Sequence, residues 1–455
     1  MLIKQYNNIA IWAMSINASI GGFLFGYNVG VFNTCQENVS STLGWGDNKD
    51  LFIALFSALI PVGALLSAVY AGVTANKYGR RKALMFADIL GAIAALITII
   101  PYTATFAIGR FLSGIAVGFF STVPPVYLSE ISPPRMSGKI GALTEFQLSI
   151  GLVVSYAFGF LLPEDNYSKH PMNYFWMFMF GFQIIMCSIQ FFMFLFVFKL
   201  DTPYWLKSQN RESDAELLRI NLYSDPNPSW LMKNDEINEE KGQSLRQMLK
   251  TGKYWHALRL GVMVNFTQEM TGVDMVAFYS TSIFEDLFHS TMLARIFTLL
   301  TGVCEFLSVI VVQKLVDRSG RKKLYEIGCL GMGFSLLLAG IFCDLSSAWV
   351  VGVVTMVMVY KLFFTLVGTI CFLYSGEILN DKLCGVSICV NWLCFTLVTF
   401  FAPFMIKYIT LAGSFWFFAG VSLLSFIYFK IDMVETKGLS KEQIKGLLMG
   451  DKAPS

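Results

Sequence analysis

Two short basic stretches recur in the sequence, Asn76–Lys82 (NKYGRRK) and Asp317–Lys323 (DRSGRKK). Each follows a long apolar segment, and two apolar segments later each has an acidic counterpart, Glu130 in YLSEI and Glu377 in YSGEI. Matched motifs at matched places indicate an internal duplication. Repeats of this kind usually surround a site near the middle of a bilayer, so the pattern predicts a membrane protein with two similar halves.

The composition agrees with a chain that lies mostly in a membrane. Of 455 residues, 55% are hydrophobic and only 14% are charged, whereas soluble proteins carry about a quarter charged residues. A helix needs about 20 apolar residues to span a bilayer. The sequence contains twelve such segments, at 9–32, 51–75, 83–101, 104–128, 138–162, 173–198, 257–283, 291–314, 324–344, 348–375, 384–406 and 413–431. We therefore predict an all-α membrane protein of twelve transmembrane helices, arranged as two pseudo-symmetric six-helix bundles.

The distribution of basic residues predicts the orientation. With both termini in the cytoplasm, most of the 34 Lys and Arg fall in cytoplasmic segments, as the positive-inside rule requires. This explains the basic clusters without a nucleic-acid partner. The predicted domains are an N-terminal bundle (1–199), a cytoplasmic linker with short helices (200–256), a C-terminal bundle (257–433) and a short cytoplasmic tail (434–455).

Two features of the linker and outer loops carry further predictions. Residues 212–221 and 243–249 have helical composition, so we expect a cytoplasmic subdomain that braces the two halves; the alternative is a disordered linker. Asn38 and Asn166 begin glycosylation sequons on predicted outer loops.

The sequence contains no sign of an enzyme. No nucleophile–base pair, metal-ligand spacing or phosphate-binding loop is present, and the nine Cys include no CxxC pair. We therefore expect no catalytic activity, no cofactor and no metal site.

The basic loops suggest a gate. Arginine forms strong bidentate hydrogen bonds with carboxylates, so the Arg side chains of the loops and the Glu residues two spans later are expected to pair and to stabilise one conformation. The alternative is that these charges only set the topology. The predicted gating residues in and near the loops are Arg80, Arg81, Glu130, Asp317, Arg318, Arg321 and Glu377.

Six further motifs complete the pattern: Gly22–Val31 (GFLFGYNVGV), Gly109–Gly114 (GRFLSG), Gln268–Asp274 (QEMTGVD), Phe278–Phe284 (FYSTSIF), Asn391-Trp392 and Val434–Gly438 (VETKG). On these motifs the chain resembles the sugar porters of the major facilitator superfamily, in particular the eukaryotic glucose facilitators, over nearly its whole length. The resemblance implies the major facilitator fold, alternating access, a plasma-membrane location and a role for Arg110 in the cytoplasmic gate. Asn28 stands where proton-coupled members carry Asp.

The resemblance also implies a substrate site with an unusual composition. Sugar porters bind hydroxyls through Gln and Asn amides, and Gln268 and Asn391 are retained. Four other amide positions hold carboxylates instead, at Glu145, Glu269, Asp274 and Glu305. The predicted site consists of these residues together with Asn28, Phe278, Tyr279 and Trp392.

Three interpretations of the acidic site compete. In the first, the carboxylates and aromatic rings bind an organic cation such as a polyamine. In the second, the substrate is a hexose or polyol, and transport is facilitative or coupled to protons carried by a cavity carboxylate. In the third, the carboxylates face one another or Lys361 and only hold helices together. We favour the cation, because a neutral hexose gains nothing from like-charged groups.

A non-transporting nutrient sensor is a more distant alternative, disfavoured by the short tail. We expect the protein to act as a monomer.

Overall fold

The structure, a computed structural model, consists of helices joined by loops in the residues that it describes. These are residues 8–133, 135–163, 171–223, 248, 250, 252, 254–345, 349–439 and 441–449.

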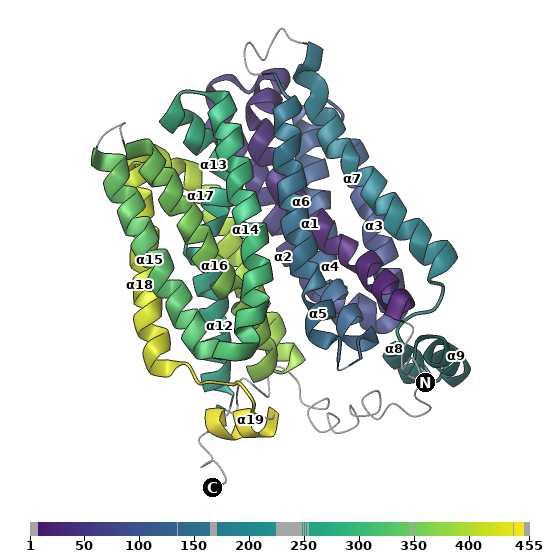
Figure 1. The fold of residues 1–455 in the computed structure, drawn as a ribbon. Coiled ribbons are helices and arrows are strands. Elements are labelled where there is room, and N and C mark those ends of the chain that lie inside the picture. The colour runs from purple at the N-terminus through teal and green to yellow at the C-terminus, as the bar shows by residue number, and fades with distance from the viewer. Residues whose placement is uncertain are drawn as a thin grey trace. The chain divides into compact units, whose positions relative to one another are not determined.

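The helices follow the predicted apolar segments (Figure 1). In the first half they are α1 (Asn8–Leu43), α2 (Lys49–Tyr78), α3 (Arg80–Thr98), α4 (Thr103–Ile131), α5 (Ser137–Gly141), α6 (Leu143–Phe158) and α7 (Phe175–Phe192). In the second half they are α12 (Trp255–Met270), α13 (Val273–Phe288), α14 (Thr291–Ser319), α15 (Arg321–Leu345), α16 (Val350–Ile378), α17 (Asp381–Ile409) and α18 (Leu411–Asp432). Every predicted segment thus falls on one helix or on a consecutive pair, α5–α6 or α12–α13.

In the part of the chain that the structure describes, ten helical segments are long and apolar enough to cross a membrane. Two predicted spans are not among them. The first is α3, which begins with three basic residues, Arg80–Lys82, and carries Asp88 in its middle. The second is the pair α12 and α13, each only 16 residues long because the helix is interrupted between them.

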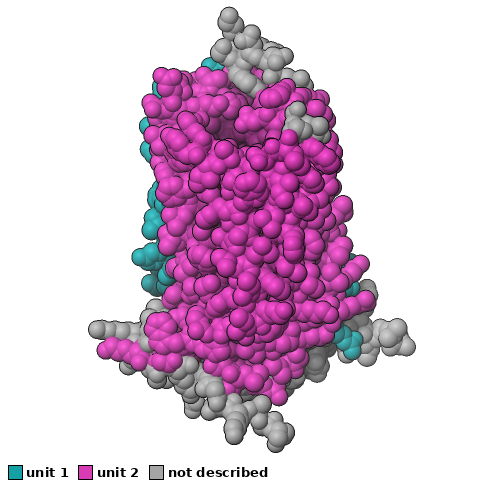
Figure 2. Space-filling view, turned by 90° about the vertical axis from the view of Figure 1, so that its left-hand side faces the viewer, with its two compact units in different colours: residues 1–31, 62–155, 174–242 teal, residues 32–61, 156–173, 243–455 magenta. Residues whose placement is uncertain are grey.

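The residues divide into two compact units that differ from the predicted bundles (Figure 2). Unit 1 comprises residues 1–31, 62–155 and 174–242, and unit 2 comprises residues 32–61, 156–173 and 243–455. The borders therefore run through α1, α2 and α6. The last residues of α1 and α6 and the first residues of α2 belong to unit 2, together with the second half of the chain.

Hydrogen bonds within unit 2 explain this division. The Asn33 side chain near the end of α1 donates to the Ala277 carbonyl (2.9 Å) and accepts from the Thr281 amide (3.0 Å), both on α13. On α14, the buried Arg295 donates to the carbonyls of Leu162 and Pro163, at 2.7 and 2.9 Å. These bonds connect the C-terminal part of α1 to α13, and the residues that follow α6 to α14.

The first of the two predicted linker helices, 212–221, is present in the structure. The structure has α8 (Pro203–Ser208) and α9 (Glu212–Leu222), and both pack on unit 1. The Trp205 indole donates to the Asn76 carbonyl (2.8 Å), and the Tyr223 hydroxyl, at the end of α9, donates to the Ile131 carbonyl (2.6 Å). The second predicted helix, 243–249, lies outside the described residues except for Met248, and a bracing role stays a prediction. In the tail, α19 (Lys441–Met449) follows.

The predicted glycosylation of Asn38 is wrong for this fold. Asn38 lies inside α1, is only 1% exposed, and donates a hydrogen bond from its amide to Asn173 Oδ1 (3.0 Å). A glycan on this nitrogen would need both the bond and the packing to be lost. The other predicted acceptor, Asn166, lies outside the described residues.

Candidate functional site

The break between α12 and α13 positions the central acidic residues. Gly272 has φ = 88°, in the left-handed region that favours glycine, and its N–H donates to the Glu269 carbonyl (3.1 Å). The Tyr360 hydroxyl of α16 donates to the Thr271 carbonyl (3.1 Å). As a result Glu269 lies in the last turn of α12, and Asp274 lies in the first turn of α13.

Replacing Gly272 by Ala is expected to destabilise the protein by about 2 to 4 kcal/mol. The left-handed backbone costs about 1–2 kcal/mol for other residues, and overpacking adds a similar amount, because the new Cβ would lie 2.6 Å from the Phe418 ring. Thermal unfolding in detergent measures the loss. Gly438→Ala is the matched control, since Gly438 also has positive φ (78°) but an added Cβ meets nothing within 4 Å. Equal losses in the two variants would contradict the steric part of the prediction.

An amide joins α17 to the end of α12. Asn391 donates from Nδ2 to Glu269 Oε1 (2.7 Å), with longer contacts to Gln268 Oε1 (3.4 Å) and to the Asn265 carbonyl (3.5 Å). All four side chains are buried. The structure therefore brings together three of the predicted site residues, Gln268, Glu269 and Asn391.

Glu269 and Asp274 lie near each other at this break, and each residue is 4% exposed. Asp274 Oδ2 is buried and has no hydrogen-bond partner among the described residues. A buried carboxylate oxygen without a donor is costly to keep charged.

Glu305 is neutralised by a lysine. On α14, its Oε2 lies 2.9 Å from the Nζ of Lys361 on α16, and the two side chains are only 13% and 3% exposed. For Glu305 this agrees with the third interpretation, in which a carboxylate faces Lys361. Of the predicted acidic site residues in unit 2, Glu305 thus has a cationic partner.

The aromatic cage that the cation interpretation predicts is wrong at Phe278. Phe278 is fully buried and meets Phe395 edge to face, with ring centroids 5.9 Å apart. Trp392 stacks on the same Phe395 at 5.5 Å, and the Tyr279 hydroxyl donates to the Thr399 carbonyl (2.8 Å). The rings pack on one another between α13 and α17, so the Phe278 face is not available to a solute.

Two predicted site residues belong to unit 1. Glu145 is half-buried in the first turn of α6, and Asn28 is buried in α1, where its amide donates to the Leu24 carbonyl (2.8 Å) of the same helix.

The assignment of Arg110 to the cytoplasmic gate is wrong. Arg110 is fully buried in α4, donates to the Asn28 carbonyl (3.1 Å), and lies 5.8 Å from the centre of the Phe180 ring. An α-helix rises 1.5 Å per residue, so Arg110 is separated from Glu130 by about 30 Å along α4. It contacts the first span rather than the charge pairs of the loops.

The other predicted charge pairs form, and they repeat in both halves. Arg80 donates to Glu130 Oε1 through Nε (3.1 Å) and Nη2 (2.7 Å). Arg321 donates to Glu377 Oε1 in the same way, at 3.1 and 2.8 Å. In each half a Thr hydroxyl, from Thr202 or Thr436, donates to the remaining oxygen of the Glu.

Sequence analysis missed two carboxylates that complete these clusters. Asp201 accepts from the backbone amides of Arg80 (3.2 Å) and Arg81 (3.0 Å) at the start of α3. Glu435 accepts from the amides of Arg321 (2.9 Å) and Lys322 at the start of α15. Burial raises the pKa of Asp201, and the backbone N–H donors oppose that shift. The signal was present as an acid followed by Thr after the sixth and twelfth spans.

The remaining gating residues lie apart from the pairs. Arg81 donates to the Phe194 carbonyl (2.9 Å). Arg318 is exposed, and its carbonyl accepts from Lys437 Nζ (2.7 Å). The Asp317 side chain is outside the described part of the structure.

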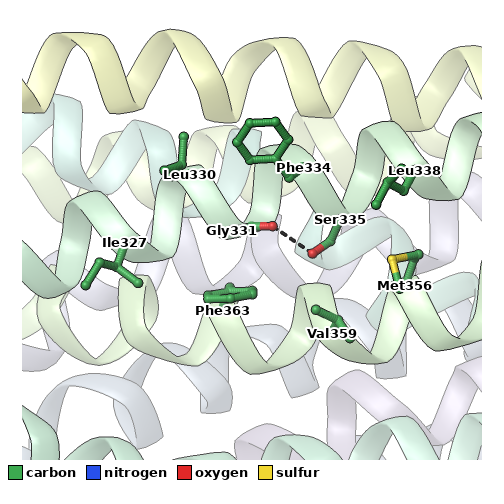
Figure 3. Close-up of a pocket in the computed structure, with 9 residues that line it drawn as sticks. All are labelled: Ile327, Leu330, Gly331, Phe334, Ser335, Leu338, Met356, Val359 and Phe363. Carbon is green, nitrogen blue, oxygen red and sulfur yellow. Dashed lines mark hydrogen bonds between the residues drawn. The ribbon is translucent and has the colours of Figure 1, made fainter.

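A groove between α15 and α16 does not suit a polar solute (Figure 3). Its one hydroxyl, on Ser335, is bonded to the Gly331 carbonyl (2.7 Å), and Phe334 and Leu338 stand exposed at its edge. Such a surface is typical of contact with lipid. The lining residues are Ile327, Leu330, Gly331, Phe334, Ser335, Leu338, Met356, Val359 and Phe363.

Comparison with known proteins identifies the family. Residues 14–448 match the family described as "Sugar (and other) transporter". The chain belongs to this family. Its relatives include the D-xylose-proton symporter of Escherichia coli (strain K12), 24% identical over 97% of this chain and 96% of the relative. Plastidic glucose transporter 4 of Arabidopsis thaliana is 29% identical over 94% and 78%, and the major myo-inositol transporter IolT of Bacillus subtilis is 27% identical over 97% and 95%.

Solved structures agree on the fold. The inward open conformation of the xylose transporter XylE from E. coli matches with a TM-score of 0.79 and 22% identity, over 96% of this chain and 99% of that one. The predicted major facilitator fold is confirmed. This sugar (and other) transporter family member is a multi-pass integral membrane protein and a transporter of the sugar-porter type, not an enzyme.

Proposed function

We propose that the protein transports a hexose, a pentose or a polyol by alternating access through a site on α12, α13 and α17. The observation that carries the proposal is the Lys361–Glu305 ion pair. The cation interpretation needs several uncompensated carboxylates, whereas this pair compensates one of the four.

The remaining polar groups suit hydroxyls. Gln268 and Asn391 offer both donors and acceptors, and the carboxyl pair accepts hydroxyl hydrogen bonds. Relatives named for xylose, arabinose, glucose and myo-inositol support the same class of solute. A plasma-membrane location and a monomeric state belong to the proposal.

The test is exchange in proteoliposomes. Labelled D-xylose, D-glucose, myo-inositol, spermidine and putrescine are each offered to vesicles loaded with the same unlabelled solute. We expect exchange of at least one hydroxylated solute and none of either amine. Exchange of the amines alone would restore the polyamine interpretation.

Asn391→Ala is expected to slow this exchange about two- to tenfold, because a lost hydrogen bond to a neutral solute hydroxyl is worth about 0.5–1.5 kcal/mol. The matched control is Ser387→Ala, one turn earlier on α17, whose hydroxyl donates within its own helix to the Cys384 carbonyl. An equal loss in both variants would show that the effect comes from packing rather than from solute binding.

A further inference from the structure

We infer that Glu269 and Asp274 form a proton-binding site, and that solute binding to the neighbouring amides drives its protonation. The inference rests on the proposed function and deepens it. It assigns proton coupling to the break in the seventh span, instead of the first span, where Asn28 cannot ionise.

Two observations point to a proton. The first is Asp274 Oδ2, a buried oxygen of a 4% exposed residue that accepts no hydrogen bond from the described residues. The second is the neighbouring carboxyl group of Glu269, also 4% exposed, which accepts from the Asn391 amide (2.7 Å). Two buried carboxylates side by side would be uncompensated, whereas a proton on Asp274 removes one charge and supplies a donor. Among the described residues no group of three or more His, Cys, Asp or Glu is placed to hold a metal ion.

The groups around Glu269 and Asp274 are mostly bound elsewhere, which is consistent with one exchangeable proton on the two carboxyl groups. From α16, Lys361 acts on Asp274 but is already bound to Glu305 of α14. Tyr360 of α16 and Cys394 of α17 also lie within electrostatic reach. Tyr360 is occupied with the Thr271 carbonyl. From α18, Ser425 reaches only the hydroxyl of Thr267 (3.0 Å). Neither cation nor hydroxyl replaces the proton on the two carboxyl groups.

Asn391 connects this proton to the solute. Its Nδ2 donates to Glu269 at 2.7 Å, and the same amide is the proposed partner of a solute hydroxyl. A hydroxyl that takes over this N–H removes a donor that stabilises the charged form of Glu269, so the pair holds its proton more strongly. Linkage is reciprocal, so a bound proton strengthens solute binding by the same factor. Both then cross together, as in a symporter.

The experiment follows pH inside proteoliposomes that contain a trapped pH-sensitive dye, with the membrane potential clamped by potassium and valinomycin. The exchanging solute of the previous section is added outside, with and without sodium. We expect the interior to acidify by about one proton per solute, since the pair holds one shared proton. Solute movement without protons overturns the inference and leaves the proposed function standing. A requirement for sodium also overturns it, because the pair would then bind Na⁺. Absence of any solute movement overturns the proposed function.

Variants test the location. Glu269→Gln and Asp274→Asn are each expected to lower the ratio of protons to solute at least about tenfold, because neither leaves a pair that can share a proton. Asp88→Asn is the matched control: Asp88 is another buried span carboxyl, on α3, and its loss should leave the ratio unchanged. An unchanged ratio in both pair variants overturns the inference.

A second measurement covers variants that transport too little. Infrared difference spectra of the solute-free protein, recorded across a pH series, report the carbonyl band of a protonated carboxyl group. In the original protein and in Asp88→Asn, one such band should disappear as the pH is raised. In both pair variants, that band should be absent at every pH. Persistence of every band in both pair variants overturns the inference.

Discussion

Replacing Lys361 by Met is expected to destabilise the protein by about 3 to 5 kcal/mol, the cost of leaving one partner of a buried ion pair without the other. Its side chain is 3% exposed and that of Glu305 is 13% exposed, so little water can take the place of the ammonium group. Thermal unfolding of the purified protein in detergent measures the loss. The double variant Lys361→Met/Glu305→Gln should recover most of it, because no uncompensated charge is then left.

The exposed pair of Lys407 and Asp50 supplies the control. Its side chains are 56% and 49% exposed at a separation of 2.7 Å, and water and salt screen such exposed pairs. Lys407→Met should therefore have little effect. A small effect of Lys361→Met, or a double variant no more stable than the single one, would show that Lys361 does not compensate the charge of Glu305. The case for a neutral solute would then lose its main support.

Replacing Arg80 by Met is expected to cost about 3 to 5 kcal/mol, because Glu130 is then left buried without its guanidinium partner. The internal repeat provides its own comparison in Arg321→Met, which removes the equivalent bonds to Glu377. The side chains of the first pair are 6% and 11% exposed, and those of the second are 17% and 22% exposed. Water screens the second pair more, so Arg321→Met should cost less, about 2 kcal/mol.

Unfolding of both variants under the same conditions checks this order. A larger loss for Arg321→Met would mean that burial does not decide the strength of these pairs. The proposed gating role is a separate matter, tested by transport rates rather than by stability.

The sequence predicted the loop clusters well because they depend on short, repeated motifs. Arg80 was matched with Glu130, and Arg321 with Glu377, from the duplication alone, and the structure has both pairs. Arg110 was misassigned, since its place was taken from a resemblance without counting the residues along α4. Asn38 was misassigned because its apolar segment ends near Phe32, whereas the helix continues to Leu43.

For the proposed site, the sequence found the residues but not their partners. Gln268, Glu269, Asp274 and Asn391 were all predicted, and the structure brings them together at the break near Gly272. The cation interpretation treated each carboxylate as an independent charge. That assumption failed at Glu305, whose partner is 56 residues away in the sequence on another helix.

By itself, the sequence determined the positions of the helices, the twofold repeat and the family, because hydropathy and short motifs are properties of neighbouring residues. Only the tertiary structure decided which partners the acidic residues have and which aromatic rings are buried. The reason is physical. The ionisation of a buried group depends on the donors and charges within a few ångströms of it, and here these come from helices that are distant in the sequence.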